Sequence, residues 1–153
     1  MNLLVIEDDS DKQIEIVSFI KENFNDINVE MADSVMSGIK MVKKNPGSKV
    51  LLDMSLPLYG LSGINNESNE FEAFGGFEVL DEIKRCRLNL EVVVFTAFDV
   101  LEDEYRRLNL EELDSYMKGE YQDYYRGCIH YDQSSLEWRS TLRIICDEWR
   151  RIE

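Results

Sequence analysis

Acidic side chains stand where two short apolar runs of the chain stop. Glu7 and Asp8 follow a first apolar run, Asp53 follows a second, and Thr96 closes the strongest apolar run of the chain. The carboxyl ends of parallel strands meet at one edge of a sheet, so these four side chains are expected to lie close together if the runs are strands. Carboxylates at short range repel each other unless a cation neutralises them, and Mg²⁺ prefers oxygen ligands. The sequence therefore predicts a Mg²⁺ pocket with a hydroxyl beside it, which suits a phosphoryl group in transfer.

The apolar runs are too short for buried helices, and they alternate with stretches of helical spacing. Strands are predicted at residues 3–6, 27–31, 50–52, 92–95 and 128–131. Helices are predicted at about residues 10–24, 34–44, 79–86, 99–126 and 138–152. This alternation predicts an α/β fold, a doubly wound five-stranded parallel sheet flanked by helices. Enlarged loops follow the third and fourth strands.

The first predicted helix has a regular apolar spacing that predicts which face is buried. Asp9 or Ser10 is expected to cap this helix, and Ser34 to begin the next one, which residues 45–47 end. The side chains expected on the buried face of the first helix are Ile14, Val17, Ile20 and Phe24.

Composition narrows the class of protein. The chain has 153 residues and a formal net charge of −14, which argues against nucleic-acid and anionic membrane partners. Without a linker or repeat, residues 1–153 are interpreted as a single domain. Three cysteines with no C-x-x-C spacing and no signal-peptide pattern predict reduced thiols and a cytoplasmic location.

Four segments resemble response regulator receiver domains, which have the CheY-like (flavodoxin-like) fold. Residues 3–9 resemble the first strand and acidic pair of that family, and residues 50–57 its phosphoacceptor strand with a proline four residues after the aspartate. Residues 76–80 resemble the start of its third helix, and residues 92–97 its fourth strand with the following Thr-Ala. Four motifs in the family's order are more specific than any one alone.

The resemblance implies a role for each matching residue. Asp53 would be the phosphoacceptor and Asp8 a direct Mg²⁺ ligand, with Glu7 acting nearby or through water. The backbone carbonyl of Ser55 would supply a further ligand. Thr96 would contact the phosphoryl group.

Two positions of the family pattern are degenerate in this sequence. Receiver domains carry a lysine at the end of the fifth strand, but here Tyr131 falls at that position and no lysine follows Lys118. The family's switch aromatic falls on Cys128. His130, the only histidine, is interpreted as a structural or surface residue. These departures leave open whether Asp53 is phosphorylated or the domain acts without phosphorylation.

Two segments are longer than the family requires, at about residues 58–75 and 99–126. The first is expected to be a lid or a mobile loop. The second contains five of the seven tyrosines, which either form an interface or pack an extra helix onto the domain.

The resemblance implies a non-enzymatic, stand-alone receiver of a two-component phosphorelay. Its partners would be a histidine kinase or phosphotransfer protein, and an unknown effector that contacts residues 99–126. A pseudo-receiver that binds its partner independently of phosphorylation is the alternative. A Mg²⁺-dependent phosphohydrolase is the third hypothesis.

Overall fold

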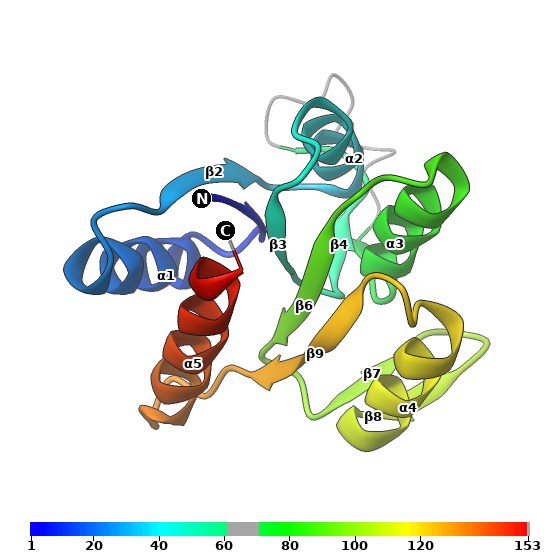
Figure 1. Ribbon diagram of the computed structural model, residues 1–153. Helices are drawn as coiled ribbons and strands as arrows, with labels where there is room; N and C mark the ends of the chain where they lie inside the picture. The colour runs from blue at the N-terminus through cyan, green and yellow to red at the C-terminus, as the bar shows by residue number, and fades with distance from the viewer. Residues whose placement is uncertain (61–70, 153) are drawn as a thin grey trace.

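A parallel sheet forms the centre of the computed structural model, which describes residues 1–60 and 71–152 (Figure 1). The strands run in the order β2-β1-β3-β6-β9, and every neighbouring pair is parallel. The predicted doubly wound five-stranded sheet is confirmed. Its strands are β1 (Asn2–Ile6), β2 (Asn28–Ala32), β3 (Lys49–Leu52), β6 (Glu91–Thr96) and β9 (Tyr125–His130).

Helices cover both faces of this sheet. In Figure 1, α1 and α5 lie on one face, and α2, α3 and α4 lie on the other. The helices are α1 (Ser10–Asn23), α2 (Val35–Lys44), α3 (Gly75–Cys86), α4 (Leu110–Glu120) and α5 (Glu137–Arg151).

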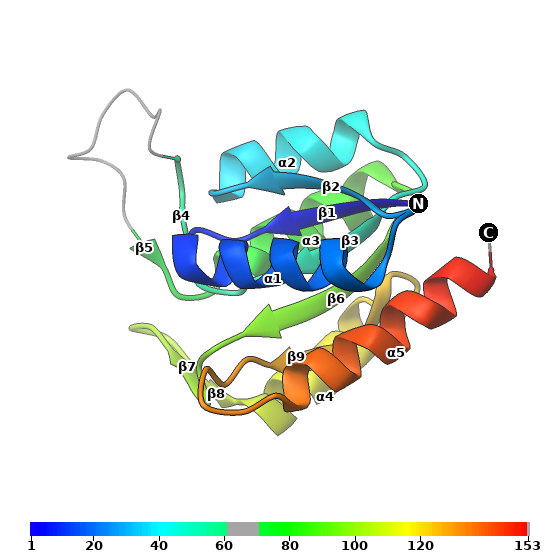
Figure 2. The same cartoon turned by 90° about the vertical axis from the view of Figure 1, so that its left-hand side faces the viewer.

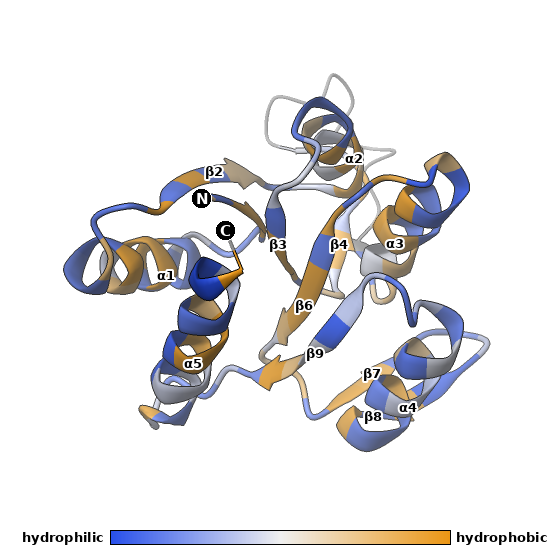
Figure 3. Cartoon of the chain, viewed as in Figure 1, coloured by the Kyte–Doolittle hydropathy of each residue, from blue (hydrophilic) through white to orange (hydrophobic). Residues whose placement is uncertain are grey.

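Side chains of the interior strand β1 alternate between two hydrophobic cores. Leu3 and Val5 pack with α1 and α5, while Leu4 and Ile6 pack with α2, α3 and α4. This period of two follows from the pleat of a strand, and a strand buried on both faces is apolar throughout. Figure 3 shows the same hydrophobic character along β6.

The predicted helix caps form with side-chain hydrogen bonds. The side chain of Asp9 accepts from the backbone N–H groups of Asp11 and Lys12 at the start of α1. Ser34 and Ser37 form a capping box at the start of α2. These bonds satisfy backbone donors that have no partner within the helix.

The buried face of α1 differs from the predicted one. Ile14 is 63% exposed, whereas Lys12, Ile16 and Phe19 are buried. The prediction was wrong for Ile14 because it counted only apolar side chains, and α1 turns a charged residue inward at this end. That residue, Lys12, faces the carboxyl edge of the sheet.

Two antiparallel pairs extend the segments that follow β3 and β6. The pair β4 (Leu56–Pro57) and β5 (Phe71–Glu72) follows β3, and the hairpin β7 (Val100–Glu102) and β8 (Arg107–Asn109) follows β6. Figure 2 shows both pairs beyond the end of the sheet toward which the strand arrows point.

Residues 99–126 were predicted to be mostly helical, and that prediction is wrong for the first part of the segment. Leu101 is buried on β7, and Leu108 packs against the core from β8, so this hairpin has a partly apolar side. The helix α4 begins only at Leu110, after an Asn109–Glu112 capping box. The loop predicted after β3 likewise holds the short strands β4 and β5, and its residues 61–70 lie outside the described part of the chain.

Boundaries elsewhere shift by a few residues. β9 begins at Tyr125, three residues before the predicted last strand, and α3 begins at Gly75 rather than near Val79. Within the described ranges, no helix has the length and apolarity to cross a membrane.

Candidate metal centre at the carboxyl edge of the sheet

Three carboxylates converge where β1 and β3 end. Glu7 and Asp8 follow β1, Asp53 follows β3, and one oxygen from each lies within 4.8 Å of the others. Backbone hydrogen bonds extend the strand pairing to this point, from Glu7 N to Ala32 O (2.9 Å) and from Asp53 N to Ile6 O (3.0 Å). The sheet itself therefore fixes the separation of the three acids.

Asp53 is almost fully enclosed, with 4% of its surface exposed. Its Oδ2 lies 3.5 Å from the ammonium of Lys12. Its buried Oδ1 has no hydrogen-bond partner among the described residues. A buried polar oxygen without a partner is costly, so Oδ1 marks a position where a ligand would be stabilised.

Burial and mutual repulsion raise the proton affinity of all three acids. The pKa of Glu7 rises to about 8, first because the carboxyl is buried and second because of the charge on Asp53. The pKa of Asp8 rises to about 6 through burial and the charge on Glu7. Burial also raises the pKa of Asp53. A cation bound here would relieve this repulsion.

Lys12 is the functional residue that the sequence interpretation missed. Its ammonium forms an ion pair with Glu7 Oε1 as well as with Asp53 Oδ2, and its side chain is 5% exposed. Lys12 stands four residues before Ile16 on the face that α1 buries, and the apolar spacing that begins at Ile14 predicts a different face.

Thr96 and Ser55 border the acids from neighbouring segments. Thr96 ends β6 and is fully buried, and its Oγ1 accepts a hydrogen bond from Phe98 N at 3.3 Å. Ser55 is buried two residues after Asp53, and its hydroxyl donates to Ala73 O at 3.1 Å. The phosphoryl contact of Thr96 and the metal-ligand role of the Ser55 carbonyl stay predictions.

The two positions predicted to be degenerate, at the last strand and just after it, have different surroundings. Tyr131 is buried, and its ring centroid lies 5.6 Å from Lys12 Nζ. Cys128 is partly buried in the other core, beside α4, and burial raises the pKa of its thiol to about 12. His130 forms an ion pair with Asp99 at 3.0 Å when protonated.

The donor set fits Mg²⁺. Glu7, Asp8 and Asp53 offer only oxygen ligands, which a small hard cation prefers. The partnerless Oδ1 of Asp53 and the raised proton affinities indicate excess negative charge that Lys12 alone does not offset.

Solved structures of receiver domains have the same fold as this chain. A CheY-like response regulator receiver domain from Methanospirillum hungatei JF-1 superposes with a TM-score of 0.62 and 15% identity, covering 99% of this chain and 98% of that one. The chain has the receiver fold. The receiver domain of a sensor histidine kinase from Pseudomonas aeruginosa PAO1 superposes with a TM-score of 0.60 and 14% identity, covering 97% of this chain and 95% of that one. That structure has a magnesium ion coordinated in its active-site cleft.

Sequence comparison gives a distant relative of similar length. The Detocs response regulatory protein DtcB of Enterobacter cloacae is 22% identical over 143 residues, which cover 93% of this chain and 95% of the relative. No family model matches the chain.

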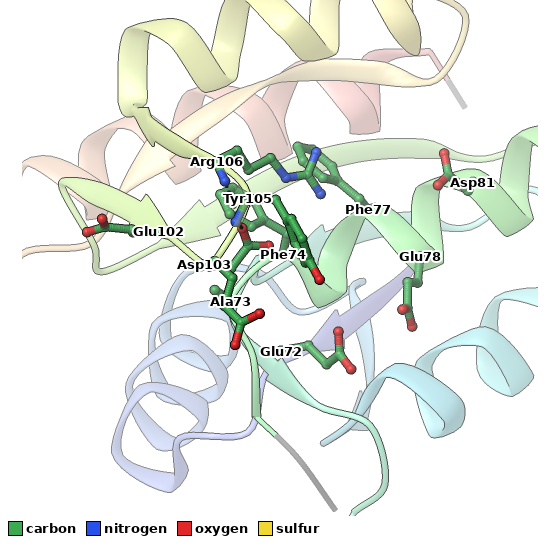
Figure 4. A pocket seen from close by; sticks show the side chains of 11 residues that line it. Glu72, Ala73, Phe74, Phe77, Glu78, Asp81, Glu102, Asp103, Tyr105 and Arg106 are labelled. Carbon is green, nitrogen blue, oxygen red and sulfur yellow. Dashed lines mark hydrogen bonds between the residues drawn. The ribbon is translucent and has the colours of Figure 1, made fainter.

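The receiver fold here also carries a pocket of about 550 Å³ away from the three acids (Figure 4). It lies between the start of α3 and the β7–β8 hairpin. The Arg106 guanidinium carbon lies 4.3 Å from the ring centroid of Phe74 and 4.7 Å from that of Phe77. These contacts fasten the hairpin to the receiver core.

The tyrosines of residues 99–126 differ in exposure, and the predicted packing role is seen for two of them. Tyr121 and Tyr125 are buried, and each donates a hydrogen bond to an aspartate, Asp81 and Asp114 respectively. Tyr105 is 91% exposed at the hairpin. The buried tyrosines attach α4 to the receiver core, whereas Tyr105 and Tyr116 (42% exposed) keep accessible surface.

Proposed function

We propose that this chain accepts a phosphoryl group on Asp53 with the help of Mg²⁺ and signals through protein–protein contacts. The observation that carries the proposal is the convergence of three carboxylates within 4.8 Å at the carboxyl edge of a receiver-type sheet. The name of the DtcB relative, a response regulatory protein, supports the same class of function.

Asp8, Glu7, Asp53 and the carbonyl of Ser55 would hold the metal. Bound Mg²⁺ supplies positive charge that screens the acids and the incoming phosphoryl oxygens. The chain's own contribution is to hold the acids on two adjacent strand ends and to exclude water around Asp53, which is 4% exposed.

Asp53 is the nucleophile of the proposed reaction. One carboxylate oxygen attacks phosphorus and forms an O–P bond, while the bond between phosphorus and the donor breaks. The leaving group departs with that electron pair, as acetate when the donor is acetyl phosphate. Thr96, on the adjoining strand end, would donate its hydroxyl proton in a hydrogen bond to a phosphoryl oxygen.

The proposed partners follow from this chemistry. A histidine kinase or phosphotransfer protein would supply the phosphoryl group, and an effector would recognise the phosphorylated surface. The chain stores the group on Asp53 rather than turning over a substrate, so we assign it a signalling role and not an enzymatic one. The exposed Tyr105 of the hairpin is a candidate effector contact.

The test is phosphorylation of the purified protein by acetyl phosphate with Mg²⁺. Intact-mass spectrometry is expected to show one added phosphoryl group, which disappears with Asp53→Asn or with a chelator. Tryptophan fluorescence gives a second readout. The ring centroids of Trp138 and Tyr131 are 5.4 Å apart, and the Tyr131 ring lies against the Lys12 ammonium beside Asp53, so a change at Asp53 is expected to reach Trp138.

A protein that gains no phosphate and whose fluorescence responds neither to Mg²⁺ nor to beryllofluoride would overturn the proposal. Effector binding that Asp53→Asn leaves unchanged would instead favour a binding module independent of phosphorylation.

A further inference from the structure

We infer that Lys12, on helix α1, is the cation that contacts the phosphoryl group carried by Asp53. The inference rests on the proposed function and assigns a residue of the first helix to the phosphoryl-binding machinery. It is carried by the position of the Lys12 ammonium, 3.5 Å from Asp53 Oδ2 and paired with Glu7 on its other side.

Lys12 is the cation that the fold supplies to this edge. All 17 lysines and arginines belong to the described part of the chain. Within the described residues, Glu7 and Asp53 each form their ion pair with Lys12. The other buried lysine, Lys49, stands at the opposite end of β3 and pairs with Glu91 at 3.7 Å.

Two aromatic rings hold the Lys12 ammonium in place. Its Nζ lies 5.7 Å from the ring centroid of Phe95 and 5.6 Å from that of Tyr131. The negative faces of aromatic rings attract a desolvated ammonium. Tyr131 also donates a hydrogen bond to Glu15 of α1 at 2.6 Å, which ties the helix that carries Lys12 to the end of β9.

In the phosphorylated state the Lys12 ammonium would offset the negative charge that the phosphoryl group adds to Asp53. A phosphoryl group carries about −2 charge near neutral pH, whereas the carboxylate it modifies carries a single negative charge. The added charge develops inside a buried pocket, where a missing counter-charge is costly. The ammonium that contacts Asp53 Oδ2 can donate hydrogen bonds to phosphoryl oxygens without leaving its aromatic support.

A purely structural ion pair makes a different prediction. If Lys12 serves only to neutralise Glu7 and Asp53, its removal leaves the carboxylates freer for Mg²⁺ and does not slow phosphorylation. If Lys12 contacts the phosphoryl group, its removal slows phosphorylation while Mg²⁺ affinity is retained or increased.

The experiment compares the wild type with Lys12→Met and Lys12→Arg, and uses Lys49→Met as a matched buried-lysine control. Acetyl phosphate and Mg²⁺ are the probes, with the rate of Asp53 phosphorylation measured by mass spectrometry and Mg²⁺ affinity by calorimetry. Lys12→Met is expected to lower the rate about 10²-fold, the effect of removing one preorganised charge-stabilising donor. Lys12→Arg is expected to retain most of the rate, and Lys49→Met all of it.

A Lys12→Met protein that is phosphorylated at the wild-type rate would overturn this inference and leave the proposed function standing. A wild-type protein that is never phosphorylated would overturn the proposed function, and this inference with it.

A measurement on the wild type keeps the test decisive if Lys12→Met does not fold. The ¹⁵Nζ resonance of Lys12 is expected to shift when beryllofluoride is added to the Mg²⁺-loaded protein. Its resonance in Asp53→Asn is expected to stay unchanged. A wild-type resonance that responds to Mg²⁺ but not to beryllofluoride would contradict contact with the phosphoryl group.

Discussion

Tyr131 donates a hydrogen bond to Glu15 at 2.6 Å, across 116 residues of sequence. The bond joins the segment after β9 to the half-buried Glu15 of α1, and the same tyrosine ring supports the Lys12 ammonium. Tyr131, which the resemblance to receiver domains predicts at the position of their lysine, therefore acts on the helix that brings Lys12 to the same edge.

We expect Tyr131→Phe to lower the free energy of unfolding by about 1.5 kcal/mol, because a hydrogen bond to a charged carboxylate is lost while the ring is kept. Urea unfolding measures the change. In a double-mutant cycle with Glu15→Ala, a coupling energy near zero would show that the bond does not contribute.

Stability is expected to depend on pH through Glu7. Its folded-state pKa of about 8 exceeds the ordinary value of 4.5, so the folded protein binds more protons than the unfolded chain between these pH values. This contribution is complete below pH 4.5 and is lost as pH rises through about 8. Glu7→Gln removes the titration, so the variant gains stability relative to the wild type between pH 5 and pH 8.

The expected relative gain exceeds about 1.4 kcal/mol, the free energy of one pKa unit. Urea unfolding in chelator at the two pH values measures it, and substitution of the exposed Glu104 by Gln is the control. Parallel pH profiles for wild type and Glu7→Gln would refute the prediction.

Two helical glycines give opposite expectations. A Cβ at Gly76 would lie 2.8 Å from the Asp53 carbonyl oxygen and 2.5 Å from Met54 Cε, whereas one at Gly119 would meet nothing within 4 Å. Gly119→Ala is expected to stabilise the protein by about 0.5–1 kcal/mol, because alanine favours the helix. Gly76→Ala is expected to destabilise it by about 1–3 kcal/mol through overpacking.

Thermal unfolding of the two variants checks the comparison. A Gly76→Ala protein as stable as Gly119→Ala would mean that α3 can move away from the segment after Asp53 without cost.

The three thiols are expected to differ in reactivity. Burial raises the pKa values of Cys128 and Cys146 to about 12, while Cys86 is exposed on α3. The thiolate is the reactive form, so iodoacetamide at pH 8 is expected to modify Cys86 first. Peptide mass spectrometry measures the order, and equal rates at all three cysteines in the folded protein would contradict it.

The sequence was sufficient to predict the centre of the sheet, because β1, β3 and β6 are buried on both faces and their sequences are therefore apolar runs. The positions of Glu7, Asp8 and Asp53 followed from the rule that parallel strands end at one edge. Lys12 could not be found in this way, since hydrophobic periodicity assigns a lysine to the solvent side of a helix and gave that buried position to Ile14.

The β7–β8 hairpin was missed for a related reason. Its strands are three residues long, and its segment is rich in charged residues. Besides the apolar contacts of Leu101 and Leu108, Arg106 stacks on Phe74 and Phe77, a contact between residues about thirty positions apart. The spacing of apolar residues along a short segment cannot predict a contact between residues so far apart in the sequence.

The two antiparallel pairs β4–β5 and β7–β8 both extend past the carboxyl edge of the sheet (Figure 2). They form a raised rim around the edge at which a phosphoryl donor would arrive if the proposed function is correct. A small donor such as acetyl phosphate meets little of this rim, but a donor domain has to match its shape. The rim would therefore select among protein donors by steric fit. The segments that determine the signalling partner would then be β4–β5 and β7–β8, which carry none of the residues that react or bind the metal.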